Sequence, residues 1–183
     1  GYNYIGGHRS AAGTVVLRSV DATTGEALPQ HFRQATVEEV DAAAKAAAAA
    51  FPAYRSLPVS RRAEFLEAIA DELDALDDTF VATVCRETAL PAARIQGERG
   101  RTSGQMRLFA KVLRRGDFYG ARIDQALPER TPLPRPDLLQ YRIGVGPVAV
   151  FCASNFPLAF STAGGDTAAA LAAGCPVVFK AHS

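Results

Sequence analysis

The stretch from residue 147 onward limits the possible folds more than any other part of the sequence. The string VAVFCAS, which starts at Val148, is a continuous apolar run, as is typical of a strand buried on both faces. The string FPLAFSTAGGDTAAALAAG then predicts a helix with Pro157 near its first turn and Gly174 just past its end. PVVFK, from Pro176, predicts a second short strand. Strand, helix and strand in this order predict a parallel β-α-β unit with a right-handed crossover.

Ligands of such units bind at the carboxyl ends of the strands. In this sequence those ends are residues 153–155 and 180–183. Two parallel strands cannot cover both of their apolar faces, and parallel sheets occur almost only where helices flank several strands. We therefore expect an α/β fold in which residues 147–183 begin a Rossmann-like parallel sheet, truncated here and completed by strands from outside this chain.

Helices are expected ahead of this unit, after a short meander of strands near the N-terminus. Thr36 and Glu39 have the spacing of a capping box, and an alanine-rich run follows them, which predicts a helix. Ser60 is a candidate cap for the next helix, whose apolar residues recur at three- and four-residue steps on one face. These patterns predict a helical segment that extends to residue 117.

The last helix of this segment contains several glycines. Pro91 fits its first turn, and Gly116 fits its stop. Gly97, Gly100 and Gly104 lie inside it, where each costs roughly 1 kcal/mol relative to alanine. This cost predicts a close backbone approach, for which helix-on-helix packing is the simplest explanation.

Residues 118–146 differ from both flanking segments. Two strand-like stretches, Phe118 to Ile123 and Leu138 to Ile143, enclose a proline-rich connection. An isolated two-stranded ribbon is marginally stable in water, so it should pack against another domain or a neighbouring subunit. We expect an antiparallel ribbon that takes part in oligomerisation.

Composition excludes several classes of protein. The 183 residues are 48% hydrophobic, and 20 basic against 19 acidic residues leave a net charge of +1, so neither nucleic acid nor an anionic membrane is an expected partner. The three cysteines lack C-x-x-C spacing and the histidines lack metal-ligand spacing, which argues against a disulfide framework and a metal site. No targeting segment or membrane span is expected, and the cytoplasm is the expected location.

The turn after the first apolar strand carries the candidate chemistry. It lacks the G-x-G-x-x-G cradle for a pyrophosphate. Asn155 stands there instead, and its amide N–H₂ could stabilise a developing oxyanion without adding a charge. Spacing alone favours the simpler role for Asn155, which is to cap the following helix. Cys152 could be an activated thiol at a helix start, but its place in an apolar strand favours an inert core residue.

A resemblance to a known family changes the weight of these alternatives. The strings GPVAVFCASNFPLAF and AAGCPVVFKAHS resemble the aldehyde dehydrogenase superfamily, whose members carry a Pro-Trp-Asn-Phe-Pro-like turn and a lysine about two dozen residues later. The helical string from ATVEEV to IADELD and the string RETALP are also similar to the family, so the resemblance covers almost the whole chain. Among its subfamilies, the C-terminal string is most similar to the α-ketoglutaric semialdehyde (2,5-dioxovalerate) dehydrogenases.

The resemblance implies roles for individual residues. Asn155 matches the asparagine that holds the oxyanion of the thiohemiacetal, and Lys180 matches the lysine that contacts the adenosine ribose. Phe151 and Cys152 fall where members of the family line the cofactor cleft. Ser183 falls where many NAD-preferring members carry a glutamate, so NADP should be accepted and favoured, with NAD as the alternative.

The resemblance also implies a division of the chain. Residues 1–117 would be the N-terminal helical part of a cofactor-binding domain, residues 118–146 the oligomerisation ribbon of a homodimer or homotetramer, and residues 147–183 the first β-α-β of the NAD(P)-binding sheet. Ser154 replaces the family's tryptophan and Ala89 replaces the glycine of its ETG string.

The family's nucleophilic cysteine and general-base glutamate lie beyond the equivalent of Ser183, so this chain alone is expected to be inactive. The parent protein is expected to oxidise an aldehyde to a carboxylate. A non-catalytic oligomerisation or interaction module remains the alternative.

Overall fold

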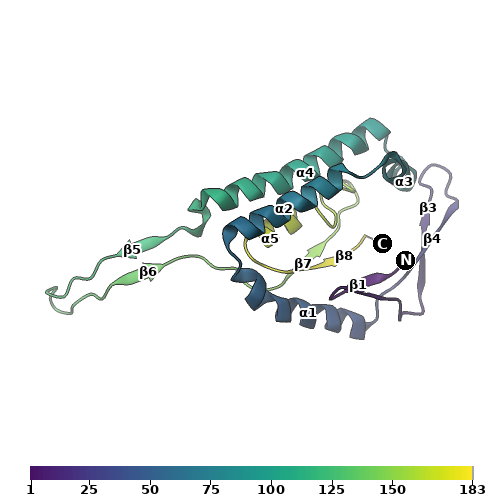
Figure 1. Ribbon diagram of the computed structural model, residues 1–183. Helices are drawn as coiled ribbons and strands as arrows, with labels where there is room; N and C mark the ends of the chain where they lie inside the picture. The colour runs from purple at the N-terminus through teal and green to yellow at the C-terminus, as the bar shows by residue number, and fades with distance from the viewer. Residues whose placement is uncertain (183) are drawn as a thin grey trace.

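A computed structural model describes residues 1–182 and has the α/β architecture expected from the sequence (Figure 1). The helices are α1 (Val37–Arg55), α2 (Val59–Asp74), α3 (Asp78–Thr88), α4 (Ala92–Arg115) and α5 (Gly165–Ala172), with a 3₁₀ turn, η1, at Asp117–Tyr119. The strands are β1 (Asn3–Ile5), β2 (His8–Ser10), β3 (Val16–Val20), β4 (Ala27–Arg33), β5 (Arg122–Asp124), β6 (Leu138–Gln140), β7 (Val148–Phe151) and β8 (Val177–Lys180). The meander expected near the N-terminus is a pair of antiparallel hairpins, β1–β2 and β3–β4.

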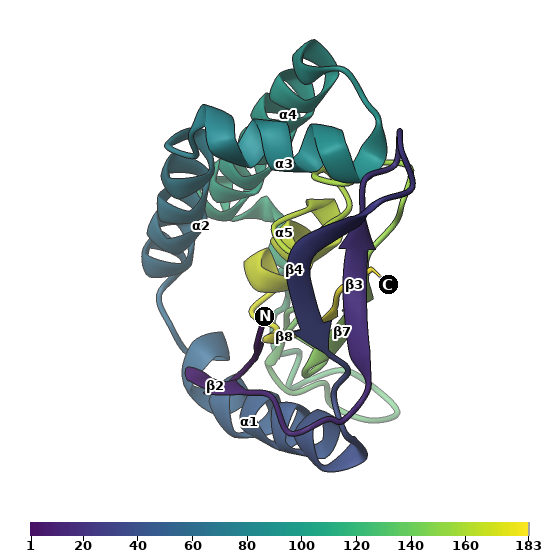
Figure 2. The ribbon, with the colours of Figure 1, turned by 90° about the vertical axis from the view of Figure 1, so that its right-hand side faces the viewer.

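Helices α1 to α4 form an arc around one side of α5 and the β7–β8 pair (Figure 2). Helices α2 and α4 lie side by side along much of their length, and α5 packs against both. Their shared core is made of small and branched residues, with Leu66, Met106 and Leu113 almost fully buried. Arg107 ties α4 to α2 at the surface through Asp71 and Asp74, at 2.6 and 2.7 Å.

The helix ends follow the sequence signals in part. The capping box at α1 is confirmed, because the Thr36 side chain accepts from the Glu39 amide while the Glu39 carboxylate accepts from the Thr36 amide. Gly116 stops α4 in a left-handed conformation, with φ +77°, as expected. The prediction that Ser60 caps the second helix is wrong. Helix α2 begins at Val59 with Pro58 as its N-cap, and the Pro58 carbonyl accepts the first helical bonds.

The glycines of α4 face open space. A Cβ built on Gly97, Gly100 or Gly104 would meet no heavy atom within 4 Å. The close approach expected from the sequence is therefore wrong for the described residues, because α4 packs on α2 through the opposite face, which carries Met106 and Ala110.

The strands of the β-α-β unit agree with the prediction from the sequence, but its helix is shorter than predicted. Strands β7 and β8 pair in parallel, from Val148 opposite Val177 to Phe151 opposite Lys180. Val150 is buried, but Phe151 is 69% exposed, so only one face of β7 is covered in the chain as described. None of the described elements covers the side on which Phe151 lies.

Helix α5 is also shorter than expected, because it starts at Gly165 and not near Pro157. Residues 157–160 make one turn, closed by the Phe160 amide on the Phe156 carbonyl, and the chain then folds back. Gly164 permits this fold, since a Cβ there would lie 2.5 Å from the Ala159 carbonyl oxygen. Gly174 follows the helix with φ +84°, as expected of a glycine just past a helix end.

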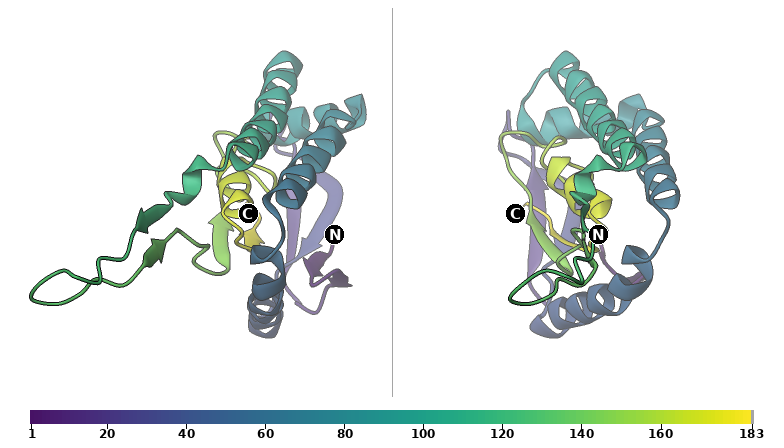
Figure 3. Two further views of the ribbon diagram at one scale, coloured as in Figure 1. Left: turned by 60° about the vertical axis from the view of Figure 1, so that its left-hand side comes forward. Right: turned by 90° about the vertical axis from the view of Figure 1, so that its left-hand side faces the viewer.

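The ribbon projects from the body as an arm (Figure 3). Strands β5 and β6 are antiparallel, and a further bridge joins Leu127 to Arg135. Both strands are shorter than expected from the sequence. Phe118 lies in η1 and packs on the α2–α4 core, and Gly120 turns the chain with φ +56° before β5 begins.

Candidate functional site

The expected site residues meet at one edge of the β7–β8 pair. Phe151 is the register partner of Lys180, and the Cys152 amide donates to the Lys180 carbonyl at 3.2 Å. Asn155 follows three residues later, in the turn that leaves this edge, and it is exposed. The fold therefore brings Phe151, Cys152, Asn155 and Lys180 to the carboxyl ends of neighbouring parallel strands. Ser183 lies outside the described residues.

The side chains at this edge differ in exposure. Phe151 and Lys180 are exposed, so an aromatic face and an ammonium group are open to a ligand. Cys152 is half-buried, and its Sγ lies 3.8 Å from the carbonyl oxygen of the next residue. With its thiol half-buried, Cys152 can line a cleft mainly through its backbone atoms.

The turn that carries Asn155 is closed by backbone hydrogen bonds on both sides of it. Before it, the Ala153 amide donates to the Phe160 carbonyl at 3.0 Å. After it, the Phe156 carbonyl accepts from the Phe160 amide at 3.1 Å. Asn155 caps no helix, because α5 begins ten residues later with Gly164 at its N-cap. The capping alternative left open by the sequence is therefore excluded.

Helix α4 supplies a contact that sequence reasoning missed. The Oε1 atom of Glu98 accepts from the amides of Leu158 and Ala159, each at 2.9 Å, and its Oε2 atom accepts from Arg94 at 3.3 Å. Only 2% of the Glu98 side chain is exposed. A signal for it exists in the sequence, since a glutamate lies at helical spacing between Ile95 and Met106 in an otherwise uncharged stripe.

Arginines of the same helix cover the aromatic residues of the turn. The guanidinium of Arg94 lies 5.0 Å and that of Arg101 lies 5.1 Å from the ring centre of Phe156. Phe160 meets Phe156 edge to face at 5.5 Å. The turn is thus packed against α4 by cation–π contacts as well as by the Glu98 carboxylate.

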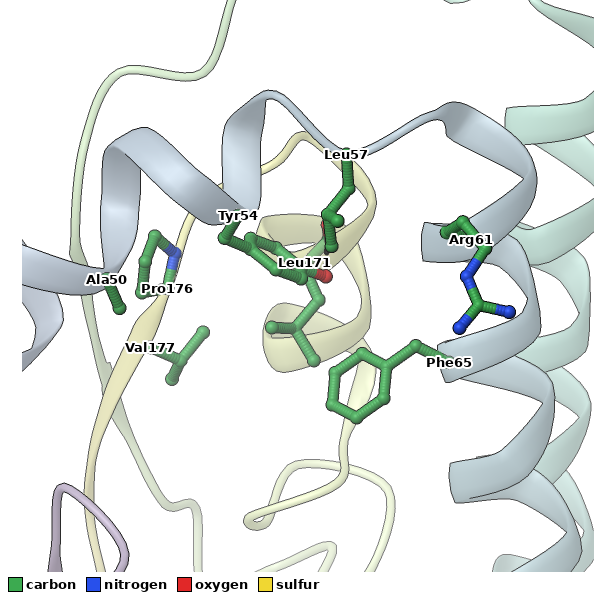
Figure 4. Close-up of a pocket in the computed structure, with 8 residues that line it drawn as sticks. All are labelled: Ala50, Tyr54, Leu57, Arg61, Phe65, Leu171, Pro176 and Val177. Carbon is green, nitrogen blue, oxygen red and sulfur yellow. Dashed lines mark hydrogen bonds between the residues drawn. The ribbon is translucent and has the colours of Figure 1, made fainter.

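A hollow of 470 Å³ lies elsewhere, between α1, α2, α5 and the start of β8 (Figure 4). Tyr54, Phe65, Leu171 and Pro176 line it, and the Tyr54 hydroxyl donates to the Leu171 carbonyl at 3.0 Å. Burial raises the pKa of Tyr54 to about 12. Because Pro176 precedes β8, the hollow is at the opposite end of the strands from Asn155 and Lys180, and we do not assign the chemistry to it.

The described residues, 1–182, also bear on metal binding and on membrane insertion. That range holds no group of three or more His, Cys, Asp or Glu side chains placed to bind a metal ion. Within the same range, every helix is too short or too polar to cross a membrane.

The fold is that of an α/β protein in which the candidate residues lie at the carboxyl ends of parallel strands, the edge at which nucleotide-binding sheets hold their ligands. The chain belongs to the aldehyde dehydrogenase family, since the model of that family matches residues 9–183.

Similar proteins agree with this assignment. The chain is 60% identical over its whole length to an alpha-ketoglutaric semialdehyde dehydrogenase of Acinetobacter baylyi, of which it covers 35%. It is 56% identical over 97% of its length to alpha-ketoglutaric semialdehyde dehydrogenase 2 of Azospirillum brasilense, of which it covers 34%. The crystal structure of PnpE in complex with nicotinamide adenine dinucleotide superposes with a TM-score of 0.76 at 27% identity, over 96% of this chain and 34% of that one. The chain thus spans about a third of the length of these relatives.

Proposed function

We propose that the full-length protein carrying this chain is an NAD(P)-dependent aldehyde dehydrogenase that oxidises 2-oxoglutarate semialdehyde to the carboxylate. The observation that carries the proposal is the placement of Asn155 and Lys180 at one edge of a parallel strand pair. Family membership supports the reaction class, and the two semialdehyde dehydrogenases that share more than half of their aligned residues with this chain support the substrate. The chain supplies the oxyanion donor and part of the cofactor site.

Asn155 is proposed as the catalytic residue of this chain. Its exposed amide N–H₂ would donate to the aldehyde oxygen as negative charge develops there, at a turn fixed on both sides by the backbone. A neutral donor stabilises that charge without competing as a proton source.

The cofactor is proposed to lie across the exposed edge. Its nicotinamide ring would supply the acceptor for the hydride that the aldehyde carbon loses. The Lys180 ammonium would hold its ribose hydroxyls, and Phe151 and the backbone of Cys152 would line its cleft. These residues suit a nucleotide, because they offer an exposed cation and an exposed aromatic face and place no carboxylate at the edge.

The preference for NADP over NAD is proposed from Ser183. A serine in place of the ribose-binding glutamate of NAD-preferring members leaves no negative charge to repel a 2′-phosphate. The variant Ser183→Glu should therefore shift the ratio of kcat/KM values from NADP toward NAD. An unchanged ratio would remove Ser183 from the preference.

The reaction is tested in the full-length protein by steady-state oxidation of 2-oxoglutarate semialdehyde. We expect Asn155→Ala to lower kcat by about 10²–10³-fold, as loss of one oxyanion donor does in other enzymes, with a smaller effect on cofactor affinity. An unchanged kcat would remove Asn155 from the mechanism. Absence of any NAD(P)-dependent oxidation by the wild-type protein would favour the non-catalytic assembly module instead.

The ribbon supports a second proposal, that β5 and β6 form a subunit contact in a homodimer or homotetramer. Ile123 and Leu139 are register partners on one face of the ribbon and are 68% and 71% exposed. Apolar residues paired on an exposed arm are typical of an interface. Light scattering tests this, since Leu139→Asp should lower the molar mass of the assembly. An unchanged mass would contradict the contact.

A further inference from the structure

The carboxylate of Glu98 holds the segment that presents Asn155 across a gap of about sixty residues in sequence. Both of its backbone donors, Leu158 and Ala159, belong to the turn between β7 and α5. The side chain is 2% exposed, and the carboxylate is stabilised by hydrogen bonds from these two amides and by the ion pair with Arg94. A buried carboxylate with such partners is strongly fixed in position, because loss of any partner leaves a charge unsatisfied.

The turn has no equivalent support from its own sequence. Residues 157–160 complete one turn, and no helix follows until Gly165. The amides of Leu158 and Ala159 therefore have no carbonyl acceptor of the kind that a regular helix provides. The Ala159 carbonyl, in turn, accepts from the Gly165 amide at 3.0 Å. Glu98 therefore fixes the centre of a loop whose first part carries Asn155.

We infer that Glu98 is a positioning residue for Asn155, which sets the direction of the amide by anchoring its turn to α4. This inference rests on the proposed function. An error of about 1 Å in the placement of a catalytic donor can lower a rate by about 10²-fold, so an anchor at this point has a kinetic consequence.

Two substitutions separate the geometry of the carboxylate from its charge. Glu98→Gln keeps an oxygen that can accept from both amides and loses the charge. Glu98→Asp keeps the charge but is one methylene shorter, so its oxygen cannot reach both amides from the same backbone position. We expect Glu98→Gln to retain most of kcat, and Glu98→Asp and Glu98→Ala to lose about 10- to 100-fold, with the KM for the cofactor changing much less. Equal losses from Gln and Asp would overturn the inference.

A double-mutant cycle in the full-length protein tests whether Glu98 acts through Asn155. If it does, Glu98→Asp lowers kcat in the wild-type background and has no further effect in the Asn155→Ala background. The same fold-loss in both backgrounds would overturn the inference and leave Glu98 with a structural role. A loss from Glu98→Asp alone, with none from Asn155→Ala, would instead overturn the proposed role of Asn155.

Leu113→Ala is the control for stability. It removes a buried side chain from the same helix, about 22 Å from Glu98 along the helix axis. We expect it to lower the thermal midpoint at least as much as Glu98→Asp and to leave kcat unchanged. If kcat falls in proportion to the thermal midpoint in both Glu98→Asp and Leu113→Ala, the inference is overturned.

Discussion

The amide of Cys152 donates a hydrogen bond to the carbonyl of Lys180 at 3.2 Å, at the carboxyl ends of the parallel β7–β8 pair. Two segments of the chain leave this edge. One turns toward Asn155, and the other continues past Lys180. This bond joins the strand that leads to Asn155 to the strand that carries Lys180.

Loss of the Lys180 side chain should act on cofactor binding and not on the chemical step. Lys180 is exposed at the sheet edge, and a hydrogen bond to a charged group contributes about 1.5–3 kcal/mol, so Lys180→Ala should raise the KM for the cofactor roughly 10- to 100-fold. Steady-state kinetics of the full-length protein check this. Lys111→Ala, at an exposed lysine of α4, is the control. A selective loss of kcat in Lys180→Ala would contradict the assignment.

Arg62 should contribute far more to stability than its neighbour Arg61. Arg62 is 3% exposed and donates to the Ala172 carbonyl at the end of α5 at 3.1 Å and to the Tyr119 hydroxyl at 2.7 Å. Arg62→Ala leaves both acceptors without a donor, so we expect a loss of about 2–3 kcal/mol in the free energy of unfolding.

The control for this prediction is the adjacent residue. Arg61 is exposed and pairs only with the exposed Glu64, a contact typically worth less than about 1 kcal/mol. Denaturant unfolding of Arg61→Ala and Arg62→Ala gives the comparison. Similar losses from the two variants would show that the buried guanidinium does not hold α2 to α5.

Local signals predicted the elements that depend on neighbouring residues. The capping box at Thr36, the stop at Gly116 and the strand on each side of the crossover need only residues a few positions apart. The apolar and alanine content of the segment after β7 predicts a helix from its start, whereas the structure has a turn there. What holds it in another form is Glu98, which is distant in sequence, and periodicity does not report such a contact.

The placement of Asn155 and Lys180 at one edge of the strand pair is predictable from the sequence for a related reason. It follows from the rule that parallel strands end at one edge, once two strands and a crossover are recognised. The exposed position of the α4 glycines is not predictable in this way, because the cost of a glycine in a helix does not depend on which face of the helix is packed.

Two glycines should respond to alanine in opposite directions. In Gly164→Ala the new Cβ would lie 2.5 Å from the Ala159 carbonyl oxygen and 2.8 Å from the Ser161 nitrogen, so the turn must move, at a cost of about 1–3 kcal/mol. In Gly104→Ala the Cβ meets nothing within 4 Å, and the helix should gain about 0.5–1 kcal/mol. Thermal unfolding of both variants checks the signs. A destabilised Gly104→Ala in the full-length protein would mean that another surface covers this face of α4.

Acid should loosen the contact between the N-terminal hairpin and α1 through a single carboxylate. Hydrogen bonds from the Ser10 hydroxyl, the Thr36 amide at 2.8 Å and the Ala12 amide at 3.2 Å lower the pKa of Glu39 to about 2, from its usual 4.5. A lowered folded-state pKa gives stability that is present above pH 4.5 and is lost as the pH falls toward 2. Glu39→Gln should therefore cost more stability at pH 7 than at pH 3, measured by urea unfolding. Ser10→Ala removes the hydrogen bond that lowers the pKa of Glu39 most, so it should raise that pKa. The stability lost on acidification should then be lost completely at a higher pH. An equal cost of Glu39→Gln at both pH values would mean that the ionised carboxylate does not hold β2 to α1.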